Sequence, residues 1–227
     1  MKKKKKNVTV VLTIVLVIVI LISVLINRKS IIQAYYTNKD QILNDFIIGR
    51  VEATVEEPDY KGNGQILQPG EEIVKNPKLS NTGEIQSYIR AQVYVPITKD
   101  LKYVDSNENI VVPNEEIEVI KYETNLGWQL VYGDDFSGVV EDNNGNKYKV
   151  YTYRYVENGK EKVLEPEGKI ETPVFDKIKV INYLDTDKKI NLKMIVKGIA
   201  IQAEGGTAEE MWTYYKNQNK TGIVGVN

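Results

Sequence analysis

Hydrophobic positions divide the chain into one continuous apolar run near its start and a longer region of alternating patterns. Residues 8–26 consist only of Val, Ile, Leu, Thr and Ser, 19 residues without a charge. At about 1.5 Å per residue, a helix of this length spans roughly 28 Å, close to the hydrocarbon thickness of a bilayer. The run predicts a signal or transmembrane helix.

Two later segments alternate with the period of two that is typical of half-buried strands. In residues 47–55 the odd positions are apolar or small, and the polar residues Arg50, Glu52 and Thr54 lie between them. In residues 89–97 the odd positions are again apolar. We therefore expect two strands with one buried face each, and we expect Arg90, Gln92 and Tyr94 to face water.

Further strands are predicted nearer the end of the chain. Residues 147–156 are rich in β-branched and aromatic side chains, and the Asn158-Gly159 pair that follows favours a type I′ turn, so a hairpin is expected. A strand is expected at residues 176–181. Residues 191–203 are apolar on nearly both faces, which predicts a central strand.

One globular helix is expected, beginning at Thr207. Thr207 and Glu210 have the spacing of a capping box, in which each side chain bonds the other residue's backbone N–H. We expect this short helix to cap the end of a sheet, with an apolar face made of Ala208, Met211, Trp212 and Tyr215. Residues 75–83 are expected to be a shaped connection. Together these patterns predict an all-β, two-sheet sandwich of roughly eight to ten strands.

Charge is distributed unevenly along the chain. Residues 1–34 hold seven of the 30 basic residues and none of the 31 acidic ones, so the rest has 23 against 31, a net charge of about −8. The lysines at positions 2–6 favour a cytoplasmic start, with everything after the apolar run exported. An acidic exported region argues against nucleic acid as a partner.

The chain contains no cysteine and no histidine. Histidine is the commonest general base and a common zinc ligand, and no zinc, nucleophile-elbow or phosphate-loop motif occurs. We therefore predict a protein that is not an enzyme and has no cofactor.

Three groups of side chains have two interpretations each. Residues 133–138 and 141–146 are solvated turns or a weak calcium site. Glu115 and Glu116 are an acid-base pair or a solvated edge, since adjacent strand residues point to opposite faces. The stripe of Tyr151, Tyr153 and Tyr155 packs across strands or binds a sugar or a partner chain.

Four pieces in a fixed order carry a family resemblance: the lysine-rich apolar leader, AYYTNKDQILNDFIIGRVEATVEEP (34–58), LQPGEEIVKNPKLSNTGEIQSYIRAQVYVP (67–96) and GIAIQAEGGTAEEMW (198–212). Together they resemble the TasA and camelysin (CalY) family of "alternate signal" exported proteins, in its BsaA-like biofilm-matrix branch. The similarity runs across nearly the whole chain.

The resemblance implies a jelly-roll-like β-sandwich that assembles into extracellular matrix fibres. It also implies a leader (1–34) that a SipW-type signal peptidase removes between Ala34 and Tyr35. The next residues, 35–46, would then be a donor strand that completes the sheet of the following subunit, ahead of a sandwich domain at 47–227. The implied self-association residues are Tyr35, Tyr36, Ile42, Leu43 and Phe46. The implied partner is a second copy, head to tail, in an open filament.

Two other functions stay open. Arg28 and Lys29 lie between the apolar run and the cut, which favours a retained anchor through residues 8–26 and a membrane-anchored surface binding module. Camelysin-like members have also been classified as metalloendopeptidases. We do not transfer that activity to a chain without histidine.

Overall fold

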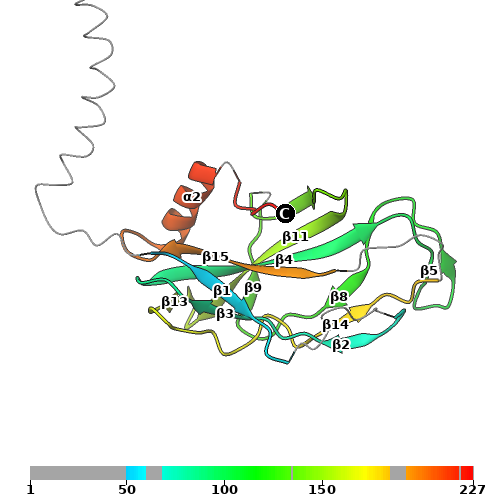
Figure 1. Cartoon of the computed structure of the whole chain (residues 1–227), viewed down its shortest axis with the longest axis horizontal. Helices are drawn as coiled ribbons and strands as arrows, with labels where there is room; N and C mark the ends of the chain where they lie inside the picture. Colours follow the sequence, from blue (N-terminus) through cyan, green and yellow to red (C-terminus); the bar gives the residue numbers. More distant parts are fainter. Residues whose placement is uncertain (1–49, 60–67, 134, 185–192, 220, 227) are drawn as a thin grey trace, which may run out of the picture. The chain divides into compact units, whose positions relative to one another are not determined.

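The computed structural model describes residues 50–59, 68–133, 135–184, 193–219 and 221–226 (Figure 1). The chain divides into two units, Met1–Ile48 and Gly49–Asn227, and every described residue belongs to the second. The expected leader (1–34), the donor segment (35–46) and the processing residues Ala34 and Tyr35 therefore lie outside the described residues and stay predictions.

The described residues form fifteen strands and one helix, and five of the strands are only two residues long. The strands are β1 (Ala53–Glu56), β2 (Glu72–Val74), β3 (Lys78–Asn81), β4 (Ser87–Thr98), β5 (Tyr103–Val104), β6 (Ile110–Val111), β7 (Ile117–Glu118), β8 (Ile120–Tyr122), β9 (Trp128–Leu130), β10 (Gly138–Glu141), β11 (Lys147–Glu157), β12 (Lys160–Glu161), β13 (Val163–Leu164), β14 (Lys177–Val180) and β15 (Ile195–Gln202), and the helix is α2 (Ala208–Asn219). An all-β protein with one short helix is what the alternating patterns predict.

An eight-stranded antiparallel sheet is built around β4 and β11, the two longest strands. Strand β11 pairs with one side of β4, and β15 pairs with the other. Beyond β11 lie β10 and β9, while β7 and β13 pair with the two ends of β4. The long alternating segment at 89–97 thus becomes the centre of the sheet.

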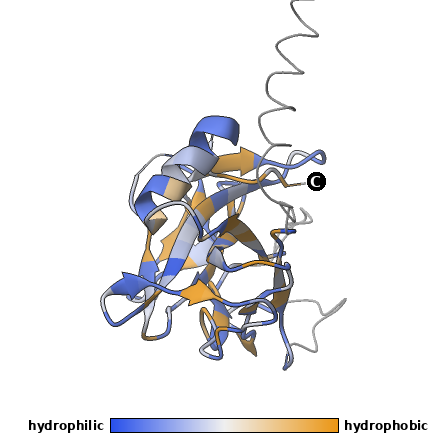
Figure 2. Ribbon diagram, turned by 90° about the vertical axis from the view of Figure 1, so that its left-hand side faces the viewer, coloured by the Kyte–Doolittle hydropathy of each residue, from blue (hydrophilic) through white to orange (hydrophobic). Residues whose placement is uncertain are grey.

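A second layer faces this sheet, made of the three-stranded sheet β2-β14-β8 and the pair β1-β3 (Figure 1). Between the layers lies the main core, to which β4 contributes its odd-numbered apolar residues. The opposite layer supplies Leu79, Ile120 and Ile178. Hydrophobic colour is carried mainly by the strands, whereas α2 is mostly hydrophilic (Figure 2). This arrangement is consistent with an all-β sandwich.

The predicted hairpin after β11 is confirmed. Glu157 pairs with Lys160, and the two residues between them, Asn158 and Gly159, have φ angles of 53° and 77°. Two positive φ angles in a two-residue loop are the signature of a type I′ turn. The strands predicted at 89–97 and 176–181 are confirmed as β4 and β14. Within residues 47–55 the described part alternates as expected, and residues 47–49 lie outside the described part.

The expectation that residues 75–83 are only a shaped connection is wrong, because β3 lies within them and pairs with β1. Asn81 ends β3 with a fully buried side chain. Its Nδ2 donates to the carbonyls of Ile85, Leu164 and Glu165, and its Oδ1 accepts the N–H of Gly83. A buried carboxamide that bonds two separate segments, 83–85 and 164–165, gives this stretch a fixed position in the layer.

Helix α2 begins as predicted, with the capping box formed. The N–H of Thr207 donates to the Glu210 carboxylate at 2.8 Å. However, α2 does not cap the end of a sheet. Trp212 lies 4.4 Å above the guanidinium of Arg90 in β4 and packs against Ile199 of β15, so the helix covers the outer face of the large sheet.

The expectation that Arg90, Gln92 and Tyr94 face water is also wrong. All three are buried, with relative exposures of 5%, 0% and 0%. Helix α2 covers Arg90, and residues 221–226 bond to Gln92 and Tyr94. The alternation of β4 correctly distinguishes its two faces, but the polar face is covered by a segment that lies 130 residues further along the chain.

Candidate functional site

Strand β15 is the structural feature that stands out as a site for association. Its residues were expected to form a central strand, and this is wrong for the described part of the chain, where β15 pairs with β4 alone. Strand β1 approaches it closely, since a Cβ at Gly198 would lie 3.0 Å from the Cβ of Ala53, but β1 bonds to β3. Among the residues that the structure describes, one side of β15 is thus an edge of the sheet.

The backbone groups on that edge follow from the hydrogen-bond register. The N–H of Ala203 donates to the Gln86 carbonyl at 2.9 Å, and this pair continues the β15-β4 ladder. Bonded and non-bonded pairs alternate in an antiparallel ladder, so the odd-numbered residues of β15 bond to β4. The N–H and C=O groups of Val196, Gly198, Ala200 and Gln202 therefore point away from β4.

The side chains of β15 are apolar on both faces of the sheet. Val196 and Ala200 pack against the main core between the layers. Ile199 and Ile201 pack on the outer face, in the cluster that contains Trp212. Apolar residues on both faces are typical of strands flanked by neighbours on both sides, which is why the sequence predicts a central strand.

Devices that usually protect an edge strand are missing from β15. Natural edges carry proline, an outward charge or a bulge. The stretch Ile195–Gln202 contains no proline, and its one charged side chain, Lys197, donates to the carbonyl of Gly225 on the outer face at 2.7 Å. The edge of β15 is thus suited chemically to receive one more strand.

The tyrosine stripe points into the sandwich. Tyr153 is buried and its hydroxyl lies 2.9 Å from that of Tyr122. Tyr155 packs edge-on against Trp128, with ring centroids 5.3 Å apart, and the Tyr151 hydroxyl donates to Glu118. The packing interpretation is therefore confirmed, with Tyr153 buried and Tyr151 and Tyr155 half-buried against the main core.

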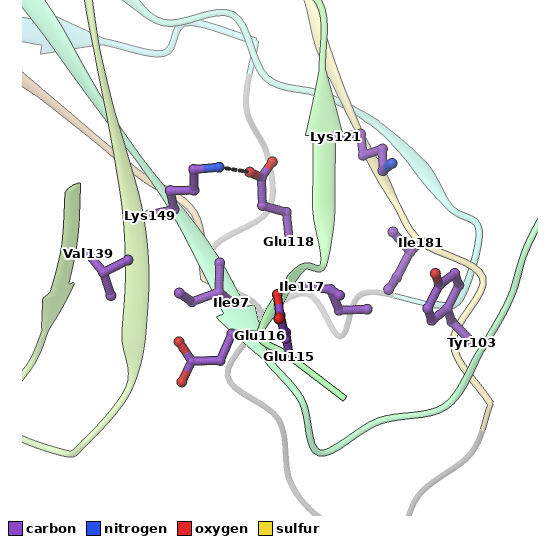
Figure 3. A pocket seen from close by; sticks show the side chains of 10 residues that line it. All are labelled: Ile97, Tyr103, Glu115, Glu116, Ile117, Glu118, Lys121, Val139, Lys149 and Ile181. Atoms are coloured by element: carbon purple, nitrogen blue, oxygen red, sulfur yellow. Dashed lines mark ion pairs between the residues drawn. The ribbon is translucent and has the colours of Figure 1, made fainter. Parts of the chain in front are cut away.

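A pocket of about 680 Å³ opens at the far end of β4 (Figure 3). Both apolar and charged side chains line it: Ile97, Tyr103, Glu115, Glu116, Ile117, Glu118, Lys121, Val139, Lys149 and Ile181. The pair Glu118–Lys149, at 3.1 Å, crosses the pocket.

Three of the charged side chains that line this pocket, Glu116, Glu118 and Lys149, form ion pairs. Glu116 pairs with Lys147 at 2.6 Å. Hydrogen bonds with Tyr151 and Glu118 raise the pKa of Lys149, and burial raises the pKa of Tyr151. Lys149 therefore stays charged and Tyr151 stays neutral near neutral pH. Glu115 and Glu116 are both exposed and precede β7, so they behave as a solvated edge, although not within a strand.

The acidic turns also make their bonds within the protein. Both oxygens of Asp142 accept bonds from its own turn, including the backbone N–H groups of Asn144 and Asn146. These bonds lower the pKa of Asp142, with the Asn146 side chain as the largest contributor. Asp135 pairs with Lys216 at 2.8 Å. This geometry favours the turn interpretation over a calcium site.

The described residues contain neither a metal-binding cluster nor a membrane-spanning helix. They contain no group of three or more acidic side chains placed to hold a metal ion. Across these same ranges, no helix combines the length and the apolarity needed to cross a bilayer, and residues 8–26 lie outside them. In comparisons with family models, with curated proteins and with solved structures, nothing matches this chain.

Proposed function

We propose that the protein is an exported structural subunit that associates with further copies by strand addition, forming a cell-surface or biofilm-matrix fibre. One observation carries the proposal: β15 has the apolar faces of an interior strand but an open edge in the described part of the chain. An added strand would bond to the outward backbone groups of β15 and extend both apolar faces.

In this proposal the added strand is the 35–46 segment of another copy, with Tyr35, Tyr36, Ile42, Leu43 and Phe46 as its apolar anchors. The family resemblance supplies this choice, together with the cut after Ala34 by a SipW-type peptidase and the jelly-roll-like form of the sandwich. The contact is heterologous, because the donor segment and the acceptor edge are different surfaces. Heterologous contacts that do not close yield open filaments.

The test is a proline placed on the open edge. Ala200→Pro removes one outward N–H and leaves the β15-β4 ladder intact, since proline is tolerated where the N–H faces away from the sheet. We expect the variant to remain folded and to form no filaments by electron microscopy. Ala200→Val, which keeps the N–H, is the matched control and should assemble. Filaments of normal length from Ala200→Pro would refute strand addition at β15.

Processing is tested separately on material from the native cell surface. Intact-mass measurement should give a chain that begins at Tyr35. A chain that retains residues 1–34 would instead support the membrane-anchored alternative.

A further inference from the structure

Residues 221–226, which we call the covering segment, lie across the outer face of the large sheet (Figure 1). They bond to side chains on that face instead of pairing with a strand edge. The carboxamide of Gln92 donates to the Gly222 carbonyl at 2.6 Å and accepts the Val224 N–H at 3.0 Å. Two bonds that flank one residue in this way reproduce the contacts that a neighbouring strand would make.

Other contacts continue along the segment. The Tyr94 hydroxyl lies 2.5 Å from the Val224 carbonyl, and Lys197 bonds to the Gly225 carbonyl. Val226 is buried beside Tyr148 and Val150. Recognition thus combines backbone groups with apolar side chains, because Val226 is buried and Ile223 and Val224 are half-buried against the sheet.

Gly222 is the position with a strict steric requirement. A Cβ there would lie 2.2 Å from the ring of Phe136, so the site accepts only glycine at this point. The ligand that fits is an extended peptide with glycine at one position and an apolar residue four positions later. The covering segment has both, as Gly222 and Val226.

Helix α2 has contacts of its own with the sheet, besides the packing of Val224 in the cluster that contains Trp212. Trp212 bonds to Glu161 through its Nε1–H at 2.8 Å, and Glu161 also binds Arg90. Only residue 220 lies between the end of α2 at Asn219 and the covering segment. The face beneath the segment carries the polar side chains of Gln92 and Thr152, so vacating it exposes groups that water can hydrate.

We propose that this face is a peptide-binding groove, and that its second ligand is the covering segment of another copy. When two copies exchange their covering segments, every contact within one chain is replaced by the same contact between chains. The equilibrium between the closed monomer and the exchanged pair therefore depends on the local concentration of subunits. Six extended residues reach about 20 Å, which requires the two outer faces to meet. Reciprocal exchange uses the same surface twice and closes after two copies. It would join subunits of neighbouring filaments in pairs, whereas strand addition at β15 lengthens one filament.

The test uses the absence of cysteine from the chain. One full-length variant carries Lys197→Cys and a second carries Gly225→Cys; they are mixed at concentrations that permit assembly and treated with a bismaleimide about as long as a lysine side chain. We expect cross-linked pairs with one copy of each variant, identified by mass spectrometry. A double variant that carries both cysteines in one chain is the control for the closed form. Cross-links within that chain, together with no mixed pairs between the two single variants, would overturn the proposal.

A second experiment distinguishes segment exchange from strand addition at β15. The pairing of neighbouring filaments by exchange rests on the proposed function. The same cysteines are placed in Ala200→Pro chains. Mixed pairs should persist there without filaments, because the groove lies on the face of the sheet and not on its edge. Disappearance of the mixed pairs together with the filaments would assign the cross-link to strand addition and refute exchange. Mixed pairs without filaments in every variant would refute the proposed function alone.

Discussion

Arg90 and Glu161 form a two-point ion pair inside the protein, with Nε and Nη2 at 2.9 and 2.8 Å from the two carboxylate oxygens. Both side chains are almost completely buried. The guanidinium also contacts the faces of two rings, 4.4 Å from the centroid of Trp212 and 5.1 Å from that of Phe136. Burial lowers the pKa of Arg90, whereas the bond and the charge of Glu161 raise it again. Glu161 of β12 therefore links Arg90 of β4 to Trp212 of α2, and it supplies the negative charge that balances the buried guanidinium.

Glu161→Gln should destabilise the protein strongly. It leaves a buried guanidinium without a counter-charge, a change that costs about 3–5 kcal/mol in comparable sites. Urea unfolding measures the loss. Glu157→Gln is the matched control, because Glu157 pairs with Lys162 at the surface, with its side chain 52% exposed. That variant should change stability by less than about 1 kcal/mol. Equal losses for both variants would contradict this account of the buried pair.

Gln92→Met should loosen the covering segment. Methionine fills similar space but leaves the Gly222 carbonyl and the Val224 N–H without their partner, which costs roughly 1–3 kcal/mol for each unsatisfied group. Limited proteolysis should then cut within residues 221–226 faster than in the unaltered chain. Gln129→Met is the control, because Gln129 is an exposed residue of β9. In that variant, residues 221–226 should be cut at the unaltered rate. Unchanged protection in Gln92→Met would show that Gln92 does not hold the segment.

Acid should weaken the start of α2. The N–H and hydroxyl of Thr207 both donate to Glu210 and lower the pKa of that carboxyl below its ordinary value of 4.5. A lowered folded-state pKa stabilises the fold above the unfolded-state value, and the contribution is lost as pH falls through the folded-state value. Glu210→Gln should therefore be less stable than the unaltered protein at neutral pH and equal to it in acid.

Unfolding midpoints measured from neutral pH downward check this expectation. Glu209→Gln removes a carboxylate from the same turn but keeps the Thr207–Glu210 bonds. The difference in stability between Glu209→Gln and the unaltered protein should therefore not change with pH as it does for Glu210→Gln. A constant gap between Glu210→Gln and the unaltered protein at every pH would be evidence against the capping box as the cause.

Alkali should destabilise the sandwich through Tyr122 and Tyr153. Burial raises the pKa of both hydroxyls, which lie 2.9 Å apart in the core. The folded protein retains these protons above the ordinary tyrosine value of 10.0, whereas the unfolded chain releases them. Stability therefore falls as pH rises beyond that value. Tyr153→Phe should make the fall less steep in denaturant unfolding at alkaline pH, and an unchanged slope would contradict the assignment.

Short-range sequence patterns were enough to predict several elements of the fold. Alternation in residues 89–97, the Asn158-Gly159 pair and the Thr207–Glu210 spacing depend on neighbours within a few residues, and the structure contains all three features. The expected association residues, Tyr35 to Phe46, lie outside the described part of the chain, so they stay predictions. The open edge that β15 has within the described residues was not predicted, because apolar residues on both faces are typical of an interior strand, whereas strand order is set by tertiary contacts.

By itself, the sequence determined the all-β class, which face of β4 is apolar, and where the helix begins, because side-chain period and capping are local properties of the chain. Only the tertiary structure decided that Gln92 and Tyr94 are buried and that β15 is an edge among the described strands. The carbonyl that Gln92 binds belongs to Gly222, 130 residues away, and the neighbours of β15 depend on strand order. No local pattern records either fact, because burial and pairing are properties of the segments that fold together in space.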